Sequence, residues 1–221
     1  MAYLKIPNAP LFLEQIHQAA HLLGLTLSDA QATGLLNYLD KLLFWTKAYN
    51  LTAITEPQEA LIKHIIDCMA IVPKLPFADQ TGVRLLDIGT GAGLPAVVIA
   101  ILKPNWQVVA LDSNNKKIRF IRQMVSELAL TNLTPVASRI QNFDGTFEVI
   151  TSRAFASLGD FVQVAAPYLA EGGVLYAMKG KAPNDGELQA LGQWHIAVQM
   201  VNVPQLSDDR CVVCLKYNKG E

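Results

Sequence analysis

The stretch LLDIGTGAGL, residues 85–94, decides the fold of this chain. An apolar segment ends near Asp87, and glycines then occupy the alternate positions 89, 91 and 93. Glycine lets the backbone approach a ligand closely, and the start of a helix offers free N–H groups to a carboxylate or phosphate. The pattern therefore predicts a strand, a ligand-binding turn and a helix, in that order. The alternative is a tight turn that needs glycine only for its backbone shape.

On the C-terminal side of this turn, short apolar segments alternate with segments of helical length. This alternation is typical of βα units around a parallel sheet. We expect strands at 83–88, 107–111, 134–138, 147–152 and 173–178, with helices at 94–102, 115–130 and 158–169. A short helix at 186–191 precedes two alternating segments, 195–203 and 211–217, which would form a closing hairpin. The sequence thus predicts an α/β fold.

Before residue 80 the pattern is helical. Apolar residues recur at three- and four-residue steps after Pro10, which predicts a first helix. Ser28 and Gln31 form a capping box ahead of a second helix, and a third helix with the same spacing follows. We therefore expect a helical N-terminal extension, residues 1–80, ahead of an α/β domain, residues 81–221.

Composition limits the functions that this chain can have. The 221 residues are 51% hydrophobic and 17% charged, which predicts a packed globular protein. Its 18 Lys and Arg against 19 Asp and Glu give a net charge of −1, so a nucleic acid would need a local positive patch. The longest apolar segment, 96–102, is too short to span a bilayer, and no secretory signal is evident. With only three cysteines, the expected location is the cytoplasm, away from membranes.

A second acidic residue, Asp112, follows the next predicted strand, 25 positions after Asp87. A carboxylate there can accept both hydroxyl groups of a ribose, so together with the glycine turn it indicates an adenosine-bearing ligand. The spacing G-x-G-x-G differs from the G-x-G-x-x-G of dehydrogenases, and the chain has no Tyr-x-x-x-Lys pair. Both details favour S-adenosylmethionine over a nicotinamide cofactor.

The helix predicted after Asp112 carries the densest group of positive charges. Its buried stripe would leave the basic residues facing solvent, beside the ligand-binding edge of the sheet. Arg153, at the end of the fourth strand, would point to the same edge. An ordinary solvated helix face is the alternative interpretation, but this position favours contact with RNA. The residues expected at this RNA surface are Lys116, Lys117, Arg119, Arg122 and Lys179.

Two further motifs are interpreted as structural. Cys211 and Cys214 have the CxxC spacing, but residues three apart on a strand point to opposite faces and cannot readily share one metal ion. His17 and His21 lie one helical turn apart without an evident third ligand. We therefore expect no metal site. His64, on the third predicted helix, is expected to be a half-buried polar residue.

Taken together, these motifs are similar to those of the RsmG (GidB) family of small-subunit ribosomal RNA methyltransferases, which methylate N7 of a guanine in 16S RNA. The resemblance covers nearly the whole chain and is more specific than the glycine turn alone. Besides that turn, it is carried by YNLTAI (49–54), HIIDC (64–68), LDS (111–113), KIRF (117–120), SRAF (152–155) and MKG (178–180).

The resemblance implies a Rossmann-like class I methyltransferase sheet of seven strands behind the helical extension, with S-adenosylmethionine as the cofactor. It also implies 16S ribosomal RNA as the partner, and the low net charge favours RNA within the assembled small subunit, bound by a monomer. Gln141 stands where the family commonly has an acid, and Cys68 where it usually has Ser. The residues implied at the cofactor are Gly89, Gly91, Leu94, Asp112, Ile140, Gln141 and Arg153.

N7 of guanine has an exposed lone pair, so methyl transfer to it requires orientation and exclusion of water but no catalytic general base. Phe155 could stack on a flipped target base. Two other classes of protein stay open. One is a nicotinamide-dependent oxidoreductase, and the other is a non-catalytic binding module that would associate with the small subunit without transferring a methyl group.

Overall fold

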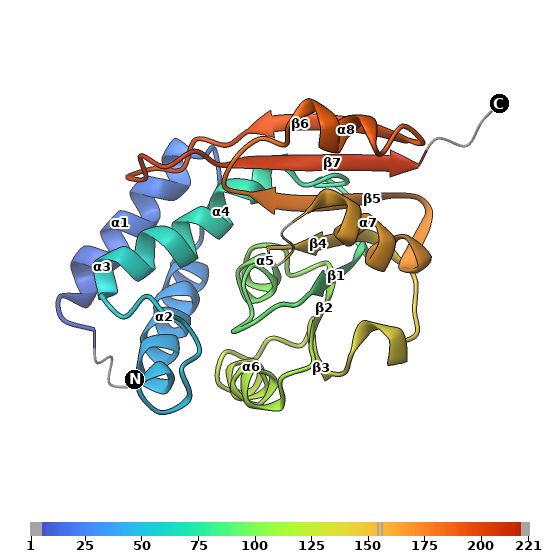
Figure 1. Ribbon diagram of the computed structural model, residues 1–221. Helices are drawn as coiled ribbons and strands as arrows, with labels where there is room; N and C mark the ends of the chain where they lie inside the picture. The colour runs from blue at the N-terminus through green and yellow to red at the C-terminus, as the bar shows by residue number, and fades with distance from the viewer. Residues whose placement is uncertain (1–5, 154, 156, 218–221) are drawn as a thin grey trace.

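Seven strands form one mixed sheet in the computed structural model, which describes residues 6–153, 155 and 157–217 (Figure 1). The strands are β1 (Arg84–Ile88), β2 (Gln107–Asp112), β3 (Leu133–Ala137), β4 (Phe147–Ser152), β5 (Leu169–Lys179), β6 (Trp194–Met200) and β7 (Cys211–Tyr217). Their order is β3-β2-β1-β4-β5-β7-β6, with β1 to β5 parallel and β7 antiparallel to both of its neighbours. The predicted α/β fold with seven strands is confirmed.

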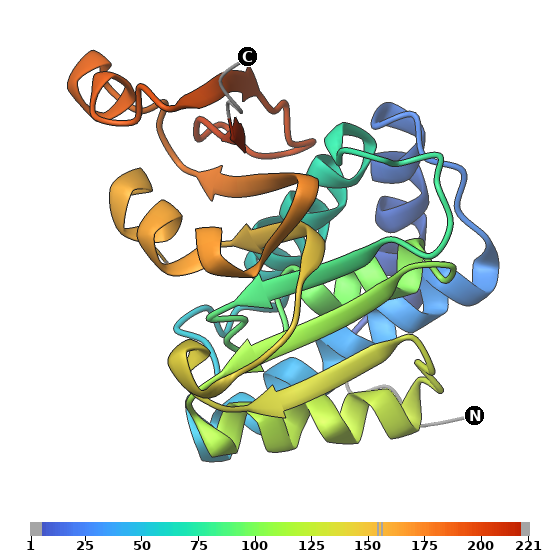
Figure 2. The same ribbon diagram turned by 90° about the vertical axis from the view of Figure 1, so that its right-hand side faces the viewer.

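The chain reverses its direction of travel across the sheet between β1 and β4, which are neighbours although two strands separate them in sequence. In open α/β sheets such a reversal leaves a crevice outside the carboxyl ends of the strands. Figure 2 shows the arrowheads of β1, β2 and β3 ending along one common edge of the sheet. The glycine turn follows β1 at this edge.

Eight α-helices are described in the structure. They are α1 (Ala9–Leu22), α2 (Asp29–Tyr49), α3 (Pro57–Ala60), α4 (Asp67–Ile71), α5 (Ala96–Leu102), α6 (Asn115–Glu127), α7 (Leu158–Ala165) and α8 (Asp185–Gln189). The predicted capping box is confirmed, because Ser28 Oγ accepts the Gln31 amide at 3.2 Å and Gln31 Oε1 accepts the Ser28 amide at 3.1 Å. The second helix runs on from this cap to Tyr49.

The third predicted helix is interrupted by a π-helical turn at Leu61–Ile66, between α3 and α4. The amide of Asp67 donates to the carbonyl of Ile62, five residues back, and not to that of Lys63, as an α-helix would require. The Lys63 carbonyl is then available to a side chain from elsewhere in the fold. The apolar spacing that predicts this helix does not distinguish a regular helix from one with such a turn.

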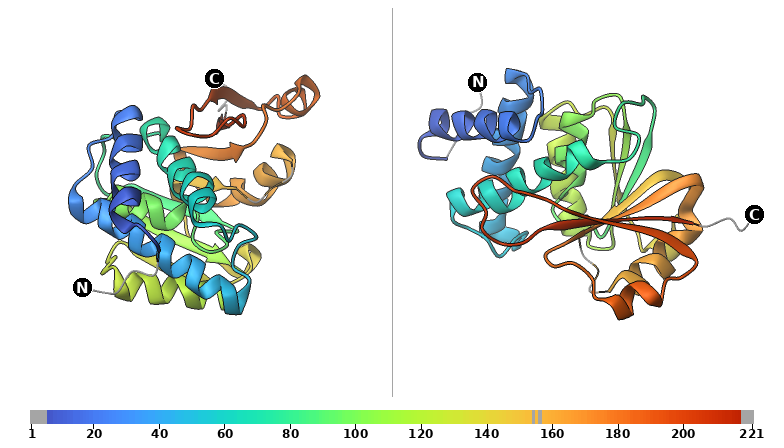
Figure 3. Two further views of the ribbon diagram at one scale, coloured as in Figure 1. Left: turned by 90° about the vertical axis from the view of Figure 1, so that its left-hand side faces the viewer. Right: turned by 90° about the horizontal axis from the view of Figure 1, so that it is seen from above.

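The helices are divided between the two faces of the sheet. Residues of α1, α2 and α4, such as Ile16 and Leu39, belong to the same buried cluster as Val97 of α5 and Val108 of β2. A second cluster joins α7 to the opposite face, with Phe161 among its members. Figure 3 shows the N-terminal helices gathered on one side of the sheet, and the loop between β6 and β7 reaching toward α4. The extension is thus a layer of the fold.

The cysteines of β7 lie as predicted. Cys211 is buried in the cluster that contains α7, whereas Cys214 packs against the cluster that contains the N-terminal helices. Within the described residues, no group of three or more His, Cys, Asp and Glu side chains is placed to hold a metal ion. In the same part of the chain, every helix is too short or too polar to cross a bilayer.

Candidate functional site

The glycine turn uses its glycines for two different purposes. Gly91 has φ of +62°, and a Cβ built on it would meet no protein atom within 4 Å. Gly93 has φ of +101°, and its Cβ would lie 2.6 Å from Cγ2 of Val97 in α5. Gly93 is therefore required by helix packing, while Gly91 opens onto free space next to the backbone.

Asp87 ties β1 to the helix that follows. Its side chain is fully buried, and Oδ2 accepts hydrogen bonds from Thr90 Oγ1 at 2.6 Å and from the Ala96 amide at 3.2 Å. Burial raises the pKa of this carboxyl to about 7, and the two hydrogen bonds only partly oppose that rise. Its Oδ1 atom has no hydrogen-bond partner among the described residues.

Asp112, at the end of β2, holds the glycine turn from the other side. Its Oδ2 accepts the Gly91 amide at 3.0 Å, and its Oδ1 accepts the Asn114 amide at 2.8 Å. A carboxylate offers about four acceptor positions, so roughly two stay available to a ligand. The same side chain therefore fixes the shape of the turn and presents acceptors beside it.

Two cavities meet at this turn. The first, the Asp112 cavity, has a volume of about 220 Å³ and is lined by Ile88, Gly89, Leu111, Asp112, Ser113, Ser138, Arg139, Ile140 and Gln141. The second, the Gly91 cavity, has about 200 Å³ and is lined by Leu51, Thr52, His64, Gly89, Thr90, Gly91, Ala92, Leu94 and Arg153. Gly89 lines both. All seven cofactor residues expected from the sequence therefore lie along one continuous edge.

The N-terminal helices contribute directly to the Gly91 cavity. Tyr38 of α2 is fully buried and donates its hydroxyl to the Ala92 carbonyl in the glycine turn, at 2.9 Å. His64, in the π-helical turn, is 5% exposed, so the expectation of a half-buried residue is wrong. The reason is that it lies among residues of segment 51–54, of α4 and of the ends of β4 and β5, and a 2.8 Å hydrogen bond joins its Nε2 to Thr52 Oγ1.

The electrostatics of the cavity keep His64 neutral. Burial, together with the nearby guanidinium of Arg153, lowers the pKa of His64 to about 4. At physiological pH a neutral imidazole can form the hydrogen bond with Thr52 but adds no positive charge to the cavity. Among the described residues that line the Gly91 cavity, Arg153 alone carries a formal positive charge.

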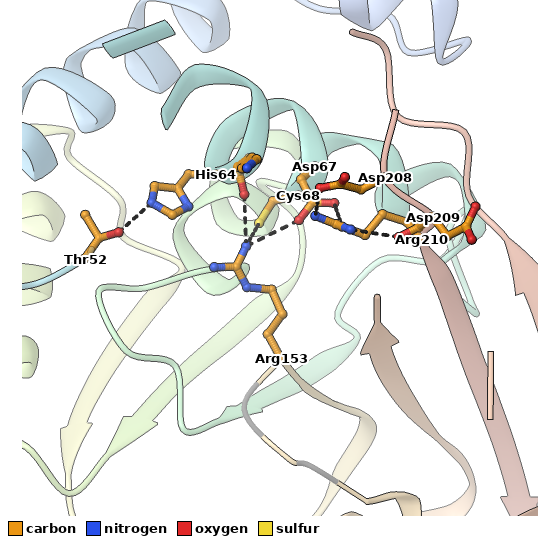
Figure 4. A network of polar contacts seen from close by, with 9 residues as sticks. Thr52, His64, Asp67, Cys68, Arg153, Asp208, Asp209 and Arg210 are labelled. Atoms are coloured by element: carbon orange, nitrogen blue, oxygen red, sulfur yellow. Dashed lines mark hydrogen bonds and ion pairs between the residues drawn. The ribbon is translucent and has the colours of Figure 1, made fainter. Parts of the chain in front are cut away.

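Arg153 extends from the end of β4 to the N-terminal helices, where one nitrogen makes several contacts (Figure 4). Nη1 lies 3.3 Å from the Lys63 carbonyl, 3.5 Å from Asp67 Oδ2 and 3.9 Å from Cys68 Sγ. In the π-helical turn, the Asp67 amide donates to the Ile62 carbonyl and not to this Lys63 carbonyl. The side chain of Arg153 is 30% exposed, so part of it stays accessible from the cavities.

Asp67 is shared by two arginines. Besides Arg153, Arg210 from the loop before β7 donates Nε to Asp67 Oδ1 at 3.1 Å (Figure 4). The Asp67 side chain is only 6% exposed, and burial raises its pKa while the two guanidinium groups oppose that rise. Neither Asp67 nor Arg210 is among the residues expected at the site. The motif HIIDC contains Asp67, but nothing in the sequence pairs it with a residue 143 positions away.

A third cavity adjoins the Gly91 cavity. This Asp67 cavity has about 340 Å³ and is lined by Ile54, Lys63, His64, Asp67, Ile71, Arg153, Met178, Lys179, Gly180, Val201, Arg210 and Cys211. It shares His64 and Arg153 with the Gly91 cavity. A larger cavity of about 690 Å³ lies beside α7 and the β6–β7 hairpin, and it shares no residue with the glycine turn.

The structure separates the basic residues expected at an RNA surface into two groups. Lys116, Arg119 and Arg122 are exposed on α6, and Lys117 is partly exposed there, on the helix that follows β2. Lys179 lies at the end of β5, where it lines the Asp67 cavity and its Nζ contacts the Phe155 carbonyl at 3.3 Å. Since β1 and β4 separate β2 from β5, the elements that carry the two groups lie on opposite sides of β1 and β4 in the sheet.

Comparison with known proteins gives a consistent result. A family model described as "rRNA small subunit methyltransferase G" (GidB) matches residues 31–213. A relative named "Ribosomal RNA small subunit methyltransferase G" from Psychrobacter cryohalolentis is 57% identical over 209 residues, which cover 94% of this chain and 86% of the relative. One of the same name from Acinetobacter baumannii is 44% identical over 210 residues, covering 93% and 98%.

Solved structures of other methyltransferases share the fold. Magnesium protoporphyrin IX methyltransferase from Synechocystis, with bound SAH, aligns with a TM-score of 0.56 at 14% identity, covering 78% of this chain and 92% of that one. Aeropyrum pernix fibrillarin, with bound S-adenosyl-L-methionine, aligns with a TM-score of 0.52 at 15% identity, covering 68% and 73%. At these identities the likeness concerns the fold alone.

Proposed function

Because this chain belongs to the GidB family of rRNA small subunit methyltransferases, we propose that it transfers the methyl group of S-adenosylmethionine to N7 of a guanine in 16S ribosomal RNA. Family membership rules out the oxidoreductase alternative. The observation that carries the proposal is the junction of the Asp112 and Gly91 cavities at Gly89, between a strand-end carboxylate and an open glycine turn.

The residues of these two cavities fit the two ends of the cofactor. In the proposal, Asp112 accepts the ribose hydroxyls, and Ile140 and Gln141 flank the adenine. Ile140 is 8% exposed and apolar, as a contact for a flat aromatic ring should be. The methionine end lies along Gly91 and Leu94, where the absence of a Cβ on Gly91 leaves room beside the backbone.

S-adenosylmethionine, when bound, supplies a methyl group activated by its sulfonium charge. The chain then has to hold guanine N7 in line with that methyl group and keep water away, since N7 requires no deprotonation. Leu51 and Leu94 are 7% and 5% exposed and supply apolar walls. Because N7 needs no base, the proposal assigns no proton transfer to His64, which is neutral.

The basic residues of α6, together with Lys179, are proposed to bind RNA phosphates on the two sides of the cavities. The net charge of −1 makes this attraction local, and we propose that a monomer acts in the cytoplasm on the assembled small subunit. In the proposal, the α/β domain, residues 81–221, binds the cofactor, while the described part of the N-terminal extension covers one face of the sheet and completes the Gly91 cavity.

The test is incubation of the purified protein with methyl-labelled S-adenosylmethionine and unmodified small subunits, followed by nucleoside mapping of the RNA. We expect label in 7-methylguanosine at one position, and much less on protein-free 16S RNA. Subunits that bind the protein but acquire no label would overturn the proposal in favour of a non-catalytic binding module. Label in any other nucleoside would overturn the assignment to N7 of guanine.

A further inference from the structure

We propose that the Asp67 cavity receives the target guanine, and that the Asp67 carboxylate accepts hydrogen bonds from the N1–H and N2–H groups of that base. The inference rests on the proposed function, since it takes guanine as the target and N7 as the methylated atom. According to this inference, a side chain of the N-terminal extension recognises guanine as the target base.

The first argument is position. The Asp67 cavity adjoins the Gly91 cavity through His64 and Arg153, so a base in it would lie next to the methyl donor. Its volume of about 340 Å³ lies within the roughly 300–1,000 Å³ range of small-molecule sites. Apolar side chains of Ile54, Ile71 and Met178 line it and could contact the faces of a flipped base.

The second argument is the shape of guanine. N7 lies on the major-groove edge of the base, whereas N1–H and N2–H lie on the neighbouring Watson–Crick edge and point in a different direction. If N7 points to the Gly91 cavity, the Watson–Crick edge faces elsewhere, and the adjoining Asp67 cavity can receive it. Two adjacent donors are matched by the two oxygens of a carboxylate. Among the described residues that line this cavity, the one carboxylate is that of Asp67.

The third argument is the way in which Asp67 is held. Each carboxylate oxygen contacts one arginine, Oδ1 at 3.1 Å from Arg210 and Oδ2 at 3.5 Å from Arg153. Two of about four acceptor positions are thereby occupied, and two stay available to a base. Burial raises the pKa of this carboxyl, which is 6% exposed, and the two guanidinium groups oppose that rise and favour the ionised form, the form that accepts hydrogen bonds. Arg210 is thus a positioning residue for Asp67.

Adenine would be disfavoured by the same arrangement. Its N1 atom is an acceptor without a hydrogen, so a carboxylate facing it meets a lone pair instead of a donor. Inosine keeps the N1–H group and lacks only the N2 amino group, which makes it the sharper probe. A hydrogen bond to a charged group contributes about 1.5–3 kcal/mol, so loss of the N2–H bond should slow transfer about 10- to 150-fold.

The experiment uses small subunits reconstituted with guanosine or inosine at the mapped target position. Single-turnover rates are measured at saturating S-adenosylmethionine, which removes the influence of cofactor affinity. We expect the unmodified protein to prefer guanosine about 10- to 150-fold, and Asp67→Asn to reduce that preference to less than about threefold. The matched control is Asp208→Asn, because Asp208 also approaches Arg210, at 3.9 Å, but is 57% exposed and does not line the cavity.

Three results would overturn the inference. The unmodified protein could methylate inosine as fast as guanosine, a result that does not depend on any variant folding. Asp67→Asn could keep the full preference for guanosine, or Asp208→Asn could lose it equally. Failure of the proposed function itself gives a different result, which is no transfer by the unmodified protein to subunits that carry guanosine.

Discussion

Replacement of Asp112 by asparagine should remove most of the affinity for the cofactor while leaving the fold in place. The two carboxylate oxygens already accept the amides of Gly91 and Asn114, at 3.0 and 2.8 Å, and the proposed ribose contacts use their other acceptor positions. Asparagine has one acceptor oxygen, and its NH₂ group must face one of these donors. Two of the bonds to the carboxylate are thus weakened or lost.

The expected loss of binding free energy follows from the type of hydrogen bond that is removed. A hydrogen bond to a charged acceptor contributes about 1.5–3 kcal/mol, so losing one and weakening another should reduce the binding free energy by about 2–4 kcal/mol. This corresponds to an increase in Kd of roughly 30- to 1,000-fold. The free energy of unfolding should fall by only about 1–2 kcal/mol, because one backbone amide of the turn loses a good acceptor.

The assay is isothermal titration calorimetry with S-adenosylhomocysteine, with a thermal melt of each protein to confirm that it is folded. Asp79→Asn is a suitable control, because Asp79 is exposed just before β1, at the end of the sheet opposite the site, and its replacement changes the net charge equally. A folded Asp112→Asn protein with a Kd within threefold of that of the unmodified protein would refute the proposed ribose contact.

Three further predictions concern the elements around the turn. Gly91→Ala should weaken S-adenosylhomocysteine binding at least about tenfold but destabilise the fold by only about 1–2 kcal/mol, whereas Gly93→Ala should mainly lower the melting temperature, since its Cβ would clash with Val97. Tyr38→Phe should lower the free energy of unfolding in urea by about 1–3 kcal/mol, because the Ala92 carbonyl loses its 2.9 Å partner. Burial raises the pKa of Asp87 from 3.8 to about 7, so the folded chain retains a proton that the unfolded chain releases, and stability should fall as the pH rises from about 4 to about 7. Asp87→Asn should flatten that dependence when urea unfolding is compared at pH 5 and pH 8, because most of the change falls between these two values.

Each of these predictions has a contradicting result. Equal losses of affinity and stability in Gly91→Ala and Gly93→Ala would mean that the two glycines are not used differently. A Tyr38→Phe protein as stable as the original would mean that its hydrogen bond to the turn contributes nothing. An unchanged pH profile in Asp87→Asn would assign the titration to another group.

Much of the site could be predicted from the sequence, because its signals are local. Asp87 and Asp112 each end a strand, and the parallel arrangement of β1 and β2 brings strand ends to one edge. The place of the glycine turn follows in the same way. Ile140 and Gln141 were expected from the family resemblance, and the structure places both in the Asp112 cavity.

The contacts that were missed are long-range. Asp67 meets Arg153 across 86 positions and Arg210 across 143, and no periodicity connects residues at such separations. The hydrogen bond from Tyr38 to the glycine turn joins residues 54 positions apart, so sequence spacing does not predict it either. The sequence does not predict the π-helical turn, because the apolar spacing of Leu61 and Ile65 fits an α-helix equally well. Local sequence thus predicts the elements and their ends, but not which helix a strand end touches.

The N-terminal helices and the sheet share one buried cluster, so we expect them to unfold together. Ile16 of α1 and Leu39 of α2 are fully buried in one cluster with Val108 of β2, so detaching the helices would expose that face of the sheet to water. Backbone amides of α2 should therefore exchange with deuterium as slowly as those of the central strands. Heat absorption on melting should appear as a single peak, with no separate event for the N-terminal layer.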